Sequence, residues 1–165
     1  MKDIFIKRGS TLLLKVTLFI MAAIVLALCI FALPSMYKGG SEEFPAASRS
    51  ILFIMIGLYV TAIPFFFALW QTLKLLIYID KNKAFSDLSV KALKNIKYCA
   101  IVIGVIYMVG VPLLLPIADA DDAPGLLVIG FAIACAPFVV AVFAAVLQKL
   151  LQNAIDIKSE NELVV

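Results

Sequence analysis

The chain has 165 residues, of which 64% are hydrophobic and 15% charged, whereas soluble domains contain about half apolar and about a quarter charged residues. This composition excludes a soluble globular protein, and four spans of about 20 residues each account for the length. The sequence has no histidine, which excludes imidazole-based metal sites and histidine-dependent nucleophiles. We therefore expect an all-α integral membrane protein with four transmembrane helices and no separate soluble domain.

The basic residues are unequally distributed along the chain. Placing both termini and the middle polar interval on one side of the membrane puts 12 of the 14 lysines and arginines on that side. Basic residues near span ends favour the cytoplasmic side. The charge pattern therefore predicts a multi-pass protein of the cell membrane with both termini in the cytoplasm.

The first predicted span covers residues 12–33. It follows a basic start, but its apolar stretch is longer than a signal-peptide core and a large residue precedes Cys29, so we expect no cleavage. Lys15 is near enough to the inner edge to extend its ammonium group to the headgroups. Pro34 is expected to end the helix. Residues 35–50, rich in turn signals, are expected to form a solvated connector.

The second predicted span, residues 51–79, would be about 43 Å long as a continuous helix, which exceeds the roughly 30 Å hydrocarbon core. It must tilt, kink or project into the cytosol. Pro64 predicts a kink, with the freed carbonyl satisfied by a neighbouring helix or by Thr61. Trp70 and Tyr78 are candidates for the inner interfacial belt.

The predicted cytosolic loop, residues 80–97, contains a helix start. Ser86 is expected to be the N-cap with Asp87 in the first turn, and Phe85 is expected to pack on Val90 as a hydrophobic staple. We therefore expect a helix that begins in the loop and continues into the third span.

This loop helix is predicted to be amphipathic. One arc of about 120° carries three lysines, and another of about 140° carries apolar side chains, at 100° per residue. The lysines are Lys91, Lys94 and Lys97, and the apolar residues are Phe85, Leu88, Ala92, Leu93 and Ile96. Two interpretations stay open: attraction to anionic headgroups of the inner leaflet, and docking of a cytosolic partner on the same face.

The third span is predicted at residues 98–118 and the fourth at 125–148. Glycines and prolines in the third span indicate close helix contacts; they are Gly104, Gly110, Pro112 and Pro116. Three aspartates in the outer turn between these spans can cap the fourth helix. A cation site there is an alternative, although calcium prefers six to eight ligands.

The fourth span contains Pro137 and is expected to emerge into the cytoplasm as an amphipathic helix, with the cytosolic tail at residues 149–165. We expect residues 158–165 to be frayed. The alternative is addition of this end as a strand to a partner's sheet.

The two halves of the chain share a pattern. Lys15 precedes Pro34 by nineteen residues, and Lys97 precedes Pro116 by the same interval. The return helices also agree, since Lys74-Leu-Leu and Ile79-Asp80 of the first half match Lys149-Leu-Leu and Ile155-Asp156 of the second, with one inserted residue. This pattern predicts two parallel-oriented helical hairpins related by an axis along the membrane normal.

Recognisable catalytic chemistry is missing from the sequence. No charged residue lies deep in a predicted span, which argues against coupled transport, and no motif for phosphate or zinc binding is present. Cys29, Cys99 and Cys135 are expected to be small apolar packing residues. We assign no catalytic, cofactor-binding or metal-binding residue and expect no enzyme activity.

Four ordered motifs, residues 63–69, 84–97, 121–125 and 147–161, resemble a known family. The chain is similar to bacterial membrane proteins, mostly of Gram-positive species, grouped as domain-of-unknown-function family 2975. Its last residues, 162–165, differ from the family's usual Leu-Thr-Ile or Leu-Thr-Val ending. The resemblance implies a small four-helix membrane protein, often encoded beside a short helix-turn-helix transcription regulator, and implies no activity.

These observations lead to the hypothesis of a membrane partner that sequesters or tunes such a regulator. The contacts would come from residues 85–97 and 148–165. A regulator's DNA-binding face is basic and would be repelled by the lysines. It would be attracted by the tail carboxylates, Asp156, Glu160 and Glu162. The protein itself is expected to bind no nucleic acid, and self-association stays open.

Two other classes compete with this hypothesis. One is an immunity or stress protein that acts within the bilayer, and the other is a component for permeation of a small molecule. Immunity predicts altered sensitivity to a membrane-active peptide without a transcriptional change. Permeation predicts flux across reconstituted vesicles, and the absence of charged residues at mid-membrane argues against it.

Overall fold

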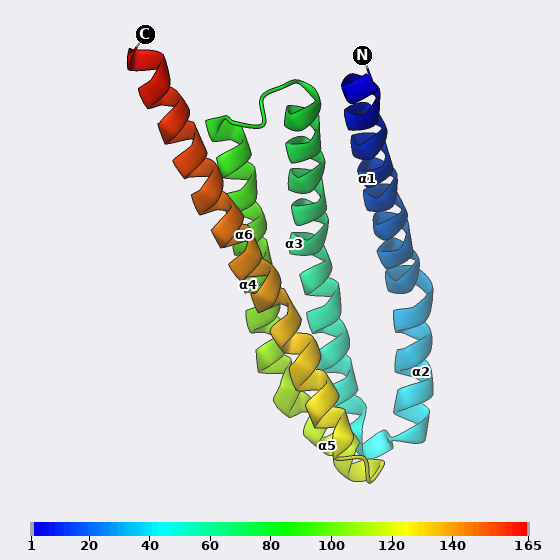
Figure 1. The fold of residues 1–165 in the computed structure, drawn as a ribbon. Helices are drawn as coiled ribbons and strands as arrows, with labels where there is room; N and C mark the ends of the chain where they lie inside the picture. Colours follow the sequence, from blue (N-terminus) through cyan, green and yellow to red (C-terminus); the bar gives the residue numbers. More distant parts are fainter. Residues whose placement is uncertain (1, 165) are drawn as a thin grey trace.

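The fold is seen in a computed structural model that describes residues 2–164. Its helical segments Phe5–Glu43, Pro45–Asp80, Asp87–Ala120 and Gly125–Leu163 are each long and apolar enough to cross a membrane. The prediction of an all-helical protein with four membrane-length helices is confirmed. Both chain ends and the connection between the second and third segments lie at the same end of the bundle (Figure 1).

The segments consist of α-helices interrupted by short turns of other helix types. Their bounds are α1 (Lys2–Ala27), a π-helical turn (Leu28–Ala32), α2 (Leu33–Glu43), a 3-10 turn (Pro45–Ala47), α3 (Ser48–Asp80), α4 (Asp87–Gly110), a second 3-10 turn (Val111–Leu114), α5 (Leu115–Ala120) and α6 (Gly125–Val164).

The first segment passes through Pro34, so the expectation that this proline ends the helix is wrong. One π-helical turn absorbs the interruption, because the backbone N–H of Leu33 donates to the carbonyl of Leu28. Because the N–H of Leu33 is used in this way, it does not bond to the carbonyl of Cys29. Pro34 cannot replace it, since proline has no backbone N–H. The hydroxyl of Tyr59 on α3 donates to this carbonyl at 2.8 Å.

The expected connector at residues 35–50 is also helical over most of its length. α2 extends to Glu43, and the N–H of Phe44 donates to the carbonyl of Gly40 at 2.9 Å. Continuing an existing helix costs less than starting one, because the unfavourable nucleation step is already complete. Turn-forming residues therefore stay helical here until just before Pro45.

α3 is continuous through Pro64. The carbonyl freed by a proline is that of the residue four positions earlier, here Val60. The alternative in which Thr61 satisfies the Val60 carbonyl is not observed, because the Thr61 hydroxyl donates instead to the carbonyl of Leu58 at 2.9 Å.

The most extensive packing joins α4 to α6 and to α3. Most of the side chains buried in this core are small or medium-sized: Ala92, Leu93, Cys99, Ala100, Ile103, Ala134, Ala141 and Ala144. A methyl group at Gly104 would lie 2.8 Å from the Phe138 ring, which confirms a close helix contact there. Gly110 differs, because a methyl group added there would have no neighbouring atom within 4 Å.

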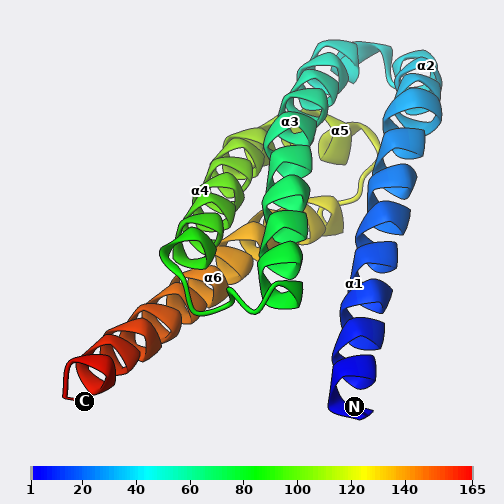
Figure 2. The same cartoon turned by 90° about the horizontal axis from the view of Figure 1, so that it is seen from above.

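α1 lies at the edge of the bundle and contacts mainly α3 (Figure 2). Among the side chains of α1 that the structure describes, Thr11 is the buried one. Large apolar side chains of α1 are exposed; Phe19, for example, retains 65% of its accessible surface. In a bilayer this surface is available to lipid.

α6 continues as a helix to Val164, so the expectations of a frayed end or a strand are wrong for the described residues. Its 40 residues correspond to about 60 Å, roughly twice the thickness of the hydrocarbon core. Its final turns extend away from the neighbouring helices (Figure 2). They form one wall of the candidate site.

Candidate functional site

The connection between α3 and α4 is a tight turn held by hydroxyl groups. Asn82 has a positive φ of 57°. The hydroxyls of Ser86 and Ser89 both donate to the carbonyl of Lys83, at 2.6 and 3.2 Å. α4 begins at Asp87 with Ser86 as N-cap, as predicted, although the Ser86 hydroxyl bonds back into the turn rather than to the helix. The turn therefore fixes where Phe85 leaves the bundle.

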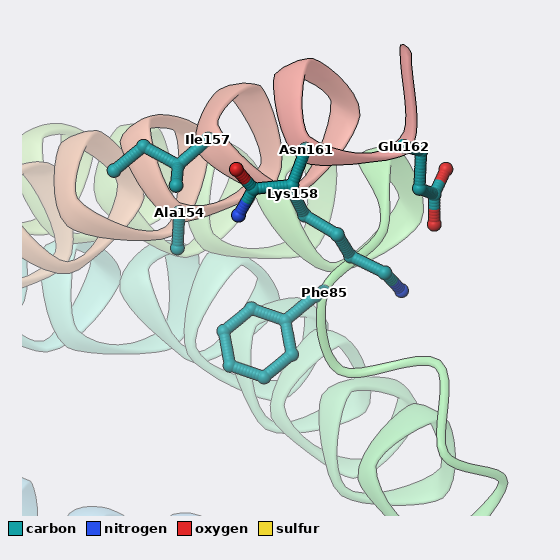
Figure 3. A pocket seen from close by; sticks show the side chains of 6 residues that line it. All are labelled: Phe85, Ala154, Ile157, Lys158, Asn161 and Glu162. Atoms are coloured by element: carbon teal, nitrogen blue, oxygen red, sulfur yellow. The ribbon is translucent and has the colours of Figure 1, made fainter. Parts of the chain in front are cut away.

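An open groove separates this turn from the end of α6. It has a volume of about 690 Å³ and is lined by Phe85, Ala154, Ile157, Lys158, Asn161 and Glu162. Ala154 and Lys158 project from α6 toward the side of the groove on which the Phe85 ring lies (Figure 3). The ring is 58% exposed. We call this feature the loop–tail groove.

Of the predicted site residues, the structure brings Phe85 and Glu162 together in the loop–tail groove. Asp156 and Glu160 are exposed on α6 and do not line it. The Asp156 carboxylate accepts a hydrogen bond from the Gln152 amide at 3.1 Å. The groove therefore has an apolar interior and one carboxylate at its rim, with the others on adjoining turns.

The three predicted lysines lie on α4 outside this groove. Lys91 and Lys94 are exposed, and Lys97 is half-buried. The ammonium groups of Lys94 and Lys97 lie 6.0 and 4.9 Å from the centre of the Tyr98 ring. Ala92 is buried on the same helix. The three lysines of α4 and the loop–tail groove therefore lie on different surfaces of the protein.

Sequence reasoning missed a polar cluster that joins α1 to the end of α3. Asp80 forms an ion pair with Lys15 and accepts a hydrogen bond from the Thr11 hydroxyl at 2.6 Å. The Lys7 ammonium donates to the side-chain carbonyl of Asn82 at 2.9 Å. Lys7, Thr11 and Lys15 are spaced four residues apart and so share one face of α1. This spacing is the feature of the sequence that could have indicated a polar face on α1.

The turn between α5 and α6 gives the alternative of a cation site no support. Asp119, Asp121 and Asp122 are all exposed. Within residues 2–164, no group of three or more histidine, cysteine or acidic side chains is arranged to hold a metal ion. The three cysteines are free thiols, with Cys99 buried and Cys29 and Cys135 half-buried.

Comparison with known proteins gives a family match over residues 14–165. The chain belongs to the family described as "Protein of unknown function (DUF2975)". It is 57% identical over 158 residues to "Uncharacterized membrane protein YoaS" of Bacillus subtilis (strain 168). The aligned region covers 96% of this chain and 99% of that protein. No solved structure matches. The resemblance inferred from four motifs is confirmed, and the chain is a multi-pass membrane protein.

Proposed function

We propose that this protein is a non-enzymatic membrane partner that sequesters or tunes a small cytosolic helix-turn-helix transcription regulator. The observation that carries the proposal is the loop–tail groove, an apolar surface at the end of a helix that is far longer than a membrane is thick. The kind of regulator comes from the family resemblance.

The proposal requires both termini and the α3–α4 connection to face the cytoplasm of a cell-membrane protein. The placement of 12 of the 14 basic residues supports this orientation. In this topology the chain forms two parallel-oriented helical hairpins. The loop–tail groove then opens into the cytosol beyond the headgroups.

The chemistry of the groove fits a short amphipathic helix of the regulator. Phe85, Ala154 and Ile157 supply apolar surface, and Lys158 and Glu162 supply charge near the rim. Amphipathic helices bind such grooves through apolar side chains spaced three or four residues apart. The preferred occupant therefore has an apolar stripe flanked by charges of both signs.

Electrostatics orients the bound regulator. The basic DNA-binding face of a regulator is attracted to carboxylates and repelled by lysines. Asp156, Glu160 and Glu162 lie on α6, whereas Lys91 and Lys94 lie on α4. We expect the DNA-binding face to turn toward α6, where it would be withheld from DNA.

Co-purification with a short helix-turn-helix regulator of the kind that the family resemblance implies tests the proposal. Phe85→Ser combined with Ile157→Ser removes apolar surface from the groove, and truncation after Gln152 removes its α6 wall. Both should abolish co-purification from solubilised membranes. The matched control is Leu163→Ser, because Leu163 is 84% exposed and lies outside the groove; it should retain the partner.

Undiminished binding of the regulator by both the groove variant and the truncation would refute the proposal. If those variants instead change sensitivity to a membrane-active peptide without altering transcription, the immunity hypothesis takes its place. Orientation is tested separately in a background without the native cysteines. Asp121→Cys should react with a membrane-impermeant maleimide in intact cells, whereas Lys158→Cys should react only after permeabilisation; the reverse result would contradict the topology.

A further inference from the structure

Two ammonium groups converge on one aromatic ring of α4. Nζ of Lys97 lies 4.9 Å and Nζ of Lys94 lies 6.0 Å from the centre of the Tyr98 ring, which is 51% exposed. Across residues 2–164 the recorded ion pair is that of Lys15 with Asp80, so neither of these lysines is paired with a carboxylate there. Each is attracted to the ring, but the two like charges repel each other.

A second pair of the same kind lies on α3, where Nζ of Lys74 is 5.8 Å from the centre of the Trp70 ring. The Thr61 hydroxyl lies 3.5 Å from the Tyr107 hydroxyl, which places these residues of the antiparallel α3 and α4 opposite each other. Trp70 is nine residues from Thr61 and Tyr98 is nine from Tyr107, both toward the connecting turn. The two rings therefore lie at one level, about 14 Å from that contact.

Aromatic rings with neighbouring lysines at one level are typical of the boundary between hydrocarbon and headgroups. Trp70 is 55% exposed, so both rings are accessible from the surroundings of the bundle. With the orientation proposed above, this level lies in the inner leaflet. Phosphate groups of phospholipids are found at the same depth as such lysine ammonium groups.

We propose that Tyr98, Lys94 and Lys97 form a binding site for the phosphate of an anionic phospholipid in the inner leaflet. The two ammonium groups donate hydrogen bonds to the phosphate oxygens, and their mutual repulsion is relieved by the negative charge. The Tyr98 ring provides a flat apolar surface for the glycerol and the first methylene groups. A zwitterionic lipid is disfavoured, because the positive group of its head would be repelled by the two lysine ammonium groups.

The site is tested on the purified full-length protein by titration with phosphatidylglycerol, with bound lipids counted by native mass spectrometry. Lys94→Gln combined with Lys97→Gln should weaken binding about tenfold or more, since each lysine near anionic headgroups contributes on the order of fivefold. The matched control is Lys81→Gln combined with Lys83→Gln, which removes the same charge from the exposed turn. It should weaken binding less than about twofold.

The ring is tested by two substitutions of the same residue. Tyr98→Leu should weaken phosphatidylglycerol binding by about two- to fivefold, because the cation–π contacts that hold both ammonium groups beside the lipid surface are then lost. Tyr98→Phe keeps the ring and should leave binding unchanged. Equal losses in the two double-lysine variants would overturn the proposal, because general attraction would then explain binding. Full displacement of the lipid by inorganic phosphate would also overturn it, in favour of a site for free phosphate.

These measurements use lipid alone, so they do not depend on the regulator. The lipid site requires only the topology on which the proposed function also relies. If lipid binding fails while co-purification succeeds, the docking proposal stands, and the opposite result leaves the lipid site standing.

Discussion

The α4–α6 interface and the α1–α3 interface hold their helices together by different means. Between α4 and α6, the buried side chains are mostly small, and the Phe138 ring of α6 packs on Gly104 of α4, so that van der Waals contact stabilises the pair. Between α1 and α3, the described contacts that stand out are polar, namely Asp80 with Lys15 and Thr11. Just beyond α1, Tyr59 of α3 donates to the carbonyl of Cys29 in the π-helical turn.

The difference shows that α3, α4 and α6 form a closely packed part of the bundle, whereas α1 is attached to it at a few points. α4 packs extensively against both α3 and α6. This part of the bundle carries the loop–tail groove and the proposed lysine–Tyr98 site. α1 packs less extensively on α3, and a few hydrogen bonds and one ion pair add to that contact. We therefore expect disruption of the α4–α6 interface to affect the whole protein, and loss of an α1 contact to affect α1 alone.

The largest effect is predicted for Gly104→Leu. A Cβ at this position would lie 2.8 Å from Cε2 of the Phe138 ring, and the further atoms of a leucine side chain add to this overlap unless the ring moves. Overpacking of this kind costs about 1–3 kcal/mol, and we expect the upper part of that range in the free energy of unfolding, measured by titration with a denaturing detergent.

Gly110→Ala is the matched control on the same helix, because nothing lies within 4 Å of its added Cβ. It should change the free energy of unfolding by less than about 1 kcal/mol, with alanine favoured for its helix propensity. Combining Gly104→Leu with Phe138→Ala should recover part of the loss. Similar losses for the Gly104 and Gly110 variants would contradict close packing as the basis of the α4–α6 interface.

A smaller and more local effect is predicted for Asp80→Asn. It removes the ion pair with Lys15 and weakens the bond from Thr11, so the first turns of α1 should exchange amide hydrogens faster, measured by mass spectrometry of peptides covering residues 2–14. The exchange of α4 and α6 should not change. Exchanging the charges, Lys15→Asp with Asp80→Lys, should restore part of the protection.

Asp156→Asn provides the comparison between the two halves of the chain. Asp80 and Asp156 occupy equivalent places in the predicted repeat, but the recorded side-chain partner of Asp156 is Gln152 on its own helix. Its substitution should leave exchange in every helix unchanged outside the last turns of α6. An equal effect of both substitutions would show that the tether at Asp80 is not specific to α1.

The sequence was sufficient to predict the features that depend on local composition. Four apolar stretches predicted four membrane-length helices, and the Ser86–Asp87 cap predicted where α4 begins. Composition acts on each stretch independently of the others, and capping involves neighbouring residues, so both are visible without tertiary information.

The features that could not be predicted depend on contacts between distant residues. Lys15 and Asp80 are 65 positions apart, and each alone is an ordinary polar residue near a span end. Pro34 was expected to end a helix because proline lacks an N–H. Its cost is lowered here by a π-helical turn and by the hydroxyl of Tyr59, 30 positions away from the carbonyl of Cys29 that it satisfies.

The smallest loss of folding stability is predicted for Tyr59→Phe, which tests that explanation directly. The substitution removes the hydroxyl that donates to the carbonyl of Cys29 at 2.8 Å. Hydrogen bonds between transmembrane helices contribute about 0.6 kcal/mol on average, so a loss of about that size in the free energy of unfolding is expected. With Pro34→Ala present, an N–H becomes available to the helix, and the further substitution Tyr59→Phe should then cost almost nothing. Additive losses in the double variant would mean that the tyrosine stabilises the contact between the π-helical turn and α3 independently of the proline.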